Sequence, residues 1–110
     1  MEKTFLVYVT ASSHEEALVI ARKVVEERLA ACANLLGNMD SIYWWEDKVQ
    51  QEKEVPMIMK TSGDRLDALI GRIKELHSYS CPCVVAVPIL GGNPDFMAWI
   101  RKETAIRSKG

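Results

Sequence analysis

Residues 41–48 (SIYWWEDK) place three large aromatic rings beside a short acidic turn. Apolar, strand-like sequence lies on both sides, in residues 32–36 before this segment and in residues 49–60 after it. This pattern predicts one long β-hairpin that turns near Glu46 and Asp47. Arms of about twelve residues would be roughly 40 Å long, which is more than the width of a compact domain of this size. We therefore expect the hairpin tip to extend beyond its own core and to associate with another chain.

Length and composition predict a single domain over residues 1–110. The hydrophobic content of 48% is sufficient for a packed core and argues against disorder. With 14 basic and 15 acidic residues the formal charge is -1, so we expect no nucleic-acid partner and no anionic membrane partner. The chain shows neither a signal-type N-terminal segment nor an apolar run of membrane-spanning length. We expect a cytoplasmic protein whose three cysteines are free thiols, buried packing residues or metal ligands.

The first half of the chain outside the hairpin predicts a strand and then a helix. Residues 4–10 are rich in strand-forming side chains. Ser13 followed by Glu16 resembles a capping box, which marks the start of a helix. The apolar residues that we expect on the inner face of this helix are Leu18, Ala21, Val25 and Leu29.

The second half predicts a helix, a strand and a last helix. Residues 64–77 carry apolar side chains at i, i+3, i+4 and i+7, the period of an amphipathic helix. Residues 84–87 (VVAV) are interpreted as a buried strand that ends before Gly91 and Gly92. Asn93 and Pro94 form a helix start, and the residues of the last helix expected to face inward are Phe96, Met97 and Ile100.

This βαββαβ order, with one further helix at the C-terminus, predicts an α+β protein of the ferredoxin-like class. Right-handed crossovers place both main helices on one face of a four-stranded antiparallel sheet. The opposite face is left uncovered. We expect a second copy of the chain to cover it.

Several segments, in their order and spacing, resemble the CutA divalent-cation tolerance family over nearly the whole chain. The segments are residues 25–34 (VEERLAACAN), 41–46 (SIYWWE), 60–61 (KT), 65–66 (RL), 75–77 (ELH) and 92–96 (GNPDF) together with Trp99. The resemblance implies a ferredoxin-like subunit in a tight homotrimer, similar in architecture to the PII signalling proteins, with clefts between subunits. It also implies a role in tolerance to copper and other divalent ions. On this resemblance the cleft residues are Trp45, Lys60 and Tyr79, and the interface aromatics are Tyr43 and Trp44.

The segment 77–83 (HSYSCPC) departs from the family pattern, because two carboxylates are replaced and two thiols are gained. Cys81 and Cys83 are two residues apart, so in extended chain both point to one face. His77 before them could supply a third ligand, and such a site would prefer soft ions such as Cu(I) or Zn(II). No cofactor is expected to be obligatory, but copper or zinc is a candidate ligand.

Each candidate residue also has a purely structural interpretation. The thiols of Cys81 and Cys83 could be packing residues, and Cys32 after the first helix has no local ligand partner. His77 could serve only as a cation at a helix C-terminus. Trp44 and Trp45 face opposite sides of a strand, so one can pack in an interface while the other lines a cleft.

The sequence does not indicate an enzyme. It contains no catalytic triad pattern, no H-E-x-x-H motif and no glycine-rich nucleotide loop. Two binding functions remain open. One is a metal-tolerance trimer that binds copper-like ions in its clefts, and the other is a PII-like regulatory trimer that binds a small anionic metabolite or a protein partner.

Overall fold

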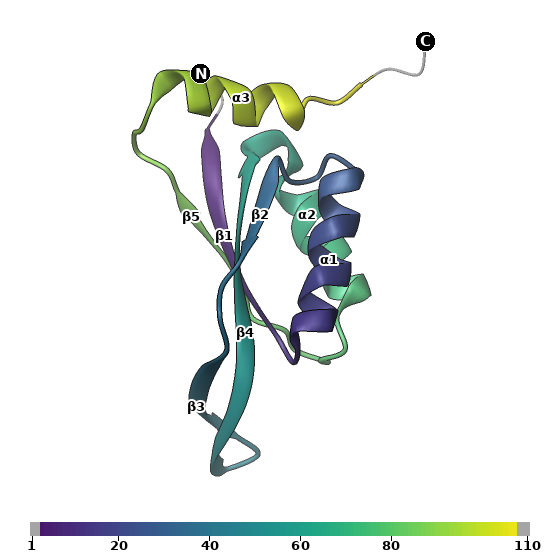
Figure 1. Cartoon of the computed structure of the whole chain (residues 1–110), viewed down its shortest axis with the longest axis vertical. Helices are drawn as coiled ribbons and strands as arrows, with labels where there is room; N and C mark the ends of the chain where they lie inside the picture. The colour runs from purple at the N-terminus through teal and green to yellow at the C-terminus, as the bar shows by residue number, and fades with distance from the viewer. Residues whose placement is uncertain (1–2, 108–110) are drawn as a thin grey trace.

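The sheet is antiparallel throughout and has the strand order β2-β4-β1-β5, with β3 paired to β4 beyond β2 (Figure 1). The computed structural model describes residues 3–107. The strands are β1 (Thr4–Ala11), β2 (Cys32–Leu35), β3 (Met39–Trp45), β4 (Lys48–Ser62) and β5 (Val84–Pro88), and the helices are α1 (His14–Glu26), α2 (Gly63–Leu76) and α3 (Pro94–Glu103). The order confirms the predicted α+β fold with a ferredoxin-like βαββαβ arrangement.

Helices α1 and α2 lie on the same face of the sheet, and the hydrophobic core lies between them and the strands (Figure 1). The strands contribute alternate residues to this core, as a sheet with one buried face requires. The fully or almost fully buried core side chains include Val7, Val9, Val55, Met57 and Met59 from the sheet and Ile20, Val24, Leu69 and Ile73 from the helices.

Helix α1 begins as predicted, but its inner face is not the predicted one. The Ser13 hydroxyl accepts a hydrogen bond from the backbone N–H of Glu16 at 3.1 Å. Ala17, Ile20, Ala21 and Val24 face the sheet, whereas Leu18 is 48% exposed. The prediction is therefore wrong for Leu18, whereas Ala21 and Leu29 are buried and Val25 packs against the core as predicted. The correct stripe uses two alanines, which contribute little to a hydrophobic pattern but allow the helix to lie close to the sheet.

The first arm of the long hairpin is broken by a bulge, so the sheet has five strands where four were predicted. Leu35 pairs with Met57 and Met39 pairs with Glu54, so the three residues 36–38 lie opposite only Val55 and Pro56. The backbone N–H of Leu36 donates to Pro56 O at 3.0 Å, but proline has no N–H to donate in return. The extra residue moves every following side chain of this arm to the opposite face of the sheet, because side-chain direction in a strand has a period of two.

The hairpin turns at Glu46 and Asp47 as predicted, and both residues have positive φ (51° and 61°). Trp45 pairs with Lys48, so this is a two-residue turn of the kind that matches strand twist. The tip projects well beyond the helices, in a molecule whose principal extents are 49 × 31 × 23 Å (Figure 1). The prediction that the hairpin outreaches its own core is confirmed.

The face of the sheet opposite α1 and α2 is covered only at one end, by α3 (Figure 1). Ile100 is fully buried, but Phe96 is 38% exposed, so its predicted inward position is only partly correct. Strand β5 is an edge strand, and Val85 and Val87 are each about half exposed, which corrects the predicted buried strand. None of the helices within residues 3–107 combines the length and apolar character needed to span a bilayer.

Candidate functional site

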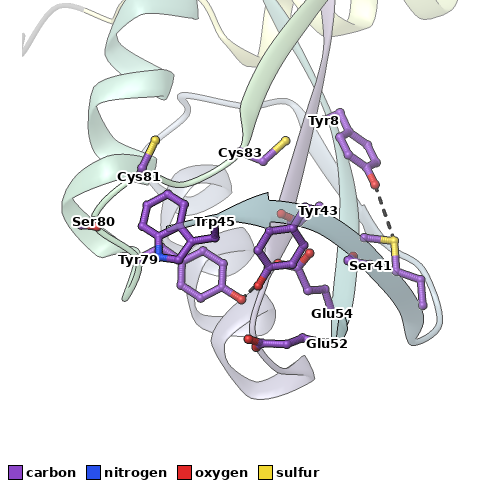
Figure 2. A pocket seen from close by; sticks show the side chains of 12 residues that line it. Tyr8, Ser41, Tyr43, Trp45, Glu52, Glu54, Tyr79, Ser80, Cys81 and Cys83 are labelled. Carbon is purple, nitrogen blue, oxygen red and sulfur yellow. Dashed lines mark hydrogen bonds between the residues drawn. The ribbon is translucent and has the colours of Figure 1, made fainter. Parts of the chain in front are cut away.

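A cavity of about 510 Å³ lies on the uncovered face of the sheet, near the base of the hairpin (Figure 2). Strands β1, β3 and β4 supply its floor and the loop between α2 and β5 supplies one wall. The twelve lining residues are Tyr8, Thr10, Met39, Ser41, Tyr43, Trp45, Glu52, Glu54, Tyr79, Ser80, Cys81 and Cys83. The bulge at residues 36–38 is what directs Tyr43 and Trp45 into this cavity, because without it they would face the other side of the hairpin.

The wall formed by the α2–β5 loop is fixed by His77, which is buried. Its Nε2 donates to the backbone oxygen of Thr10 at 2.7 Å, since a carbonyl can only accept, and its Nδ1 accepts from the N–H of Tyr79 at 3.1 Å. The imidazole also packs against the Tyr79 ring, with centroids 4.7 Å apart. His77 therefore holds Tyr79 in the cavity wall.

Glu16 provides a second anchor for the same loop. One carboxylate oxygen accepts from the Ser78 N–H at 2.8 Å, and the other accepts from the N–H and hydroxyl of Ser12. Partial burial works against the charged form, but the hydrogen bonds from Ser78 and Ser12 lower the pKa of Glu16 to about 2. An ionised Glu16 thus joins the start of α1 to the loop that carries the two thiols.

The electrostatic character of the cavity is negative. Glu54 is only 8% exposed and accepts a hydrogen bond from the Tyr79 hydroxyl at 3.0 Å. Burial, together with the Glu54 carboxylate, raises the pKa of Tyr79, and burial followed by the charges of Cys83 and Glu54 raises the pKa of Tyr8. Among the lining residues that the structure describes there is no lysine, arginine or histidine. The cavity is suited to cations rather than anions.

Cys81 and Cys83, which their spacing predicted to share one face, both line the cavity, and both residues are exposed and form no disulfide (Figure 2). Partial burial is the largest effect on the pKa of Cys83 and raises it; a hydrogen bond with Thr10 opposes this rise, and the Glu54 carboxylate adds a smaller increase. His77 does not join them as a ligand in this arrangement, because both of its ring nitrogens already have hydrogen-bond partners. Within residues 3–107, no three His, Cys, Asp or Glu side chains are grouped so that they could hold a metal ion.

The remaining predicted site residues lie in the cavity, beside β2, or on the opposite side of the hairpin. Trp45 and Tyr79, predicted for a cleft between subunits, line this cavity of the single chain, and so does Tyr43, which was predicted as an interface residue. Lys60 does not reach it. Its Nζ lies 2.9 Å from Asn34 Oδ1 and 4.0 Å from the sulfur of Cys32, near β2, so the predicted Cys32 ligand is also separate from Cys81 and Cys83. Trp44 faces the opposite side of the hairpin and is 73% exposed.

Sequence reasoning missed the two carboxylates and Tyr8. Glu52 and Glu54 are separated by one residue on a strand, so they face the same side, and that spacing was a usable signal. Tyr8 lies on β1 and Glu52 and Glu54 lie on β4, with two strands between them in the sequence, and only the pairing of β1 with β4 brings Tyr8 to the same cavity.

Comparison with known proteins agrees with this fold. Residues 5–103 match the family described as CutA1 divalent ion tolerance protein. The chain belongs to this family. The sequence resemblance is thereby confirmed, and the family name describes tolerance to ions rather than a catalysed reaction.

Individual CutA relatives match this chain along most of its length. The divalent-cation tolerance protein CutA of Thermus thermophilus is 40% identical over 99 residues, which cover 90% of this chain and 96% of that protein. The chloroplastic CutA 1 of rice, Oryza sativa, is 41% identical over 101 residues, which cover 92% of this chain. The same match covers only 57% of the rice protein, so the chain spans little more than half of that relative.

Solved CutA structures superpose closely on this chain. The Thermus thermophilus structure has a TM-score of 0.89 at 40% identity and covers 96% of this chain and 100% of its own. The structure from Archaeoglobus fulgidus, described as a periplasmic divalent cation tolerance protein, has a TM-score of 0.89 at 38% identity, with coverages of 92% and 98%. The CutA fold is thus present from β1 to α3.

Proposed function

We propose that this divalent-cation tolerance protein acts as a homotrimer that binds soft metal ions, copper among them, at clefts between its subunits. The proposal is carried by one observation: two free thiols, Cys81 and Cys83, lie in the wall of an acidic cavity on an uncovered sheet face. Thiolates select soft ions such as Cu(I) and Zn(II). A neighbouring subunit would complete the coordination that one chain leaves incomplete. In this account the protein binds ions and is not an enzyme.

The exposed apolar surface supports the assembly. Ile42, Trp44 and Val49 form an apolar patch on the outer face of the hairpin, each more than half exposed. Val85 and Val87 add further apolar surface on the sheet face. Such surface is uncommon on a monomer and typical of an interface between chains. The number of three subunits rests on the family resemblance.

The alternative of a PII-like trimer that binds a small anionic metabolite or a protein partner has less support. An anion would need basic side chains, and the described lining of the cavity has none. A neighbouring copy would have to supply Lys60 before an anion could bind there. Cytoplasmic localisation also stays a prediction; it is supported by the free thiols, whereas the Archaeoglobus fulgidus relative is described as periplasmic.

Titration of Cu(I) under reducing conditions tests the proposal. We compare the parent with a Cys81→Ser, Cys83→Ser double variant, and use Cys32→Ser as the matched control. The double variant should lose at least about tenfold in Cu(I) affinity while Mg(II) binding stays unchanged. Because the pKa of Cys83 is raised, the parent's affinity should increase with pH through the thiol range. Equal Cu(I) affinity of parent and double variant, with assembly intact in both, would refute the metal site.

A further inference from the structure

The carboxylates of the cavity have no cationic partner within residues 3–107. Glu54 is more than nine-tenths buried, and one of its oxygens accepts from the Tyr79 hydroxyl. No described group donates to its other oxygen, and none of the ion pairs found in this part of the chain includes Glu52 or Glu54. Glu52 is exposed, and no wholly buried polar atom of the described side chains lacks a partner, so the free carboxylate oxygens face the open cavity. The cavity therefore presents two carboxylates, with no described cation beside them, to a positive charge from outside the chain.

Aromatic rings surround the same space. Figure 2 shows Tyr43 and Trp45 from β3 and Tyr79 from the loop gathered above the two carboxylates, with Tyr8 on the far side. The negative faces of such rings attract cations, most strongly where water is excluded. The volume of about 510 Å³ lies in the range of small-molecule sites. Rings together with carboxylates suit a cation that also has a carbon skeleton.

We propose that this cavity binds an organic ammonium ion, whose charged head lies between the aromatic rings and the carboxylates of Glu52 and Glu54. A hard metal ion at these carboxylates would need several oxygen ligands at short distance, and within the described part of one chain no three ligating side chains are grouped there. An ammonium group needs only ring faces and carboxylate oxygens. This inference deepens the proposed function by naming a second cation for the same cleft, and it rests on that cleft remaining open in the assembly.

Calorimetric titration of the full chain near neutral pH tests the inference with two pairs of probes. Putrescine is compared with neutral butanediol, and choline with its neutral carbon isostere dimethylbutanol. At least one ammonium probe should bind about tenfold more tightly than its neutral counterpart. The inference is overturned if neither ammonium probe binds to the intact assembly, or if each binds no better than its neutral counterpart.

Variants locate the binding. Glu54→Gln and Trp45→Leu should each weaken ammonium binding about tenfold, and Glu52→Gln serves if Glu54→Gln fails to fold. The matched control is Glu75→Gln, an exposed carboxylate of α2 beside Arg72 and outside the cavity lining. Loss of binding in this control equal to that in Glu54→Gln would show an unspecific charge effect and overturn the inference.

Two further variants separate this inference from its alternatives. The Cys81→Ser, Cys83→Ser double variant should keep its ammonium binding even where Cu(I) binding is lost, so the two proposals fail independently. Lys60→Met should leave ammonium binding unchanged. Binding that appears only in Lys60→Met would show that a neighbouring copy's Lys60 already supplies the positive charge, which would overturn the inference.

Discussion

At the scale of single residues, Glu16 connects helix capping with the candidate site. Its backbone N–H is capped by Ser13, while its carboxylate receives hydrogen bonds from Ser12 and Ser78. Ser78 lies between His77 and Tyr79, which form the cavity wall. One carboxylate therefore links the stability of the fold to the position of the loop.

The stabilisation by Glu16 should depend on pH in a defined direction. Its pKa falls from 4.5 to about 2 on folding, so its contribution is complete above about pH 4.5 and is lost as the pH falls towards 2. We expect Glu16→Gln to lower the free energy of unfolding by about 1 to 2 kcal/mol near pH 7, after allowance for solvent screening. Urea unfolding of the parent and the variant near pH 7 and near pH 2 measures the difference in the free energy of unfolding.

The control for this prediction is Glu15→Gln, in the same helical turn but outside the hydrogen-bond network. Its effect should be small and nearly independent of pH. A Glu16→Gln difference that is the same near pH 2 and near pH 7 would show that the carboxylate charge does not stabilise the loop.

The sequence predicted part of the candidate site. Cys81 and Cys83 line one cavity, but both lie in the loop before β5, where Tyr79 and Ser80 line it too, so strand alternation does not account for their position. Trp45 and Tyr79, predicted to line a cleft between subunits, line a cavity of the single chain, and their place in a cleft between subunits stays a prediction. His77 could not be assigned from sequence, since its role depends on the carbonyl of Thr10, 67 residues away. Lys60 was grouped with Trp45, but within one chain its position on β4 places it beside Asn34 instead.

At the scale of elements, helix α1 is followed by a residue type that is uncommon in the left-handed conformation found there. Arg28 has a φ of 59° where glycine is usual. The N–H of Arg28 donates to Val25 O at 3.0 Å and that of Leu29 donates to Val24 O at 2.9 Å, the hydrogen bonds of a Schellman motif. An ion pair from Arg28 to Glu103 of α3, 2.9 Å long, accompanies this backbone strain.

Two substitutions at this position separate backbone strain from the ion pair. Arg28→Ala and Arg28→Gly both remove the pair with Glu103, but only glycine adopts a positive φ without a steric penalty. The glycine variant should therefore be more stable than the alanine variant by about 1 kcal/mol in thermal or urea unfolding. At Lys23, inside the same helix, the order should be reversed. A more stable alanine variant at both positions would contradict the assigned helix end.

The helices and strands were largely predictable from the sequence, but the bulge that interrupts the first arm of the hairpin was not. Capping by Ser13 and Asn93 and the stripe of α2 are local patterns, and the structure confirms both caps and the helix. The bulge at residues 36–38 arises because Pro56 lacks an N–H on the partner strand, a property of the pair of strands. The pattern of one strand therefore could not show which face Trp45 occupies.

At the scale of the whole molecule, the hairpin is the part of the fold that its own chain does not cover. The helices bury one sheet face, α3 covers one end of the other, and the tip extends away from both (Figure 1). On β3, Trp44 belongs to the apolar patch and Trp45 points into the cavity. In the proposed account, Trp44 packs between subunits and Trp45 lines the ligand cleft.

Trp44→Ser should therefore dissociate the assembly or weaken it by a few kcal/mol, as truncation of a central interface aromatic does. The matched control is Leu90→Ser, which removes a fully exposed side chain in the loop after β5. The control should remain assembled. Dissociation of Leu90→Ser with an intact Trp44→Ser would place the interface elsewhere on the molecule.

Sedimentation equilibrium of the parent chain tests the central claim most directly. An obligate interface formed by the hairpin and the uncovered sheet face should keep three chains together at micromolar concentration. The account predicts a mass three times that of the 12.4 kDa chain, with no stable monomer on dilution. A well-folded monomer that persists at these concentrations, or a dimer, would contradict it.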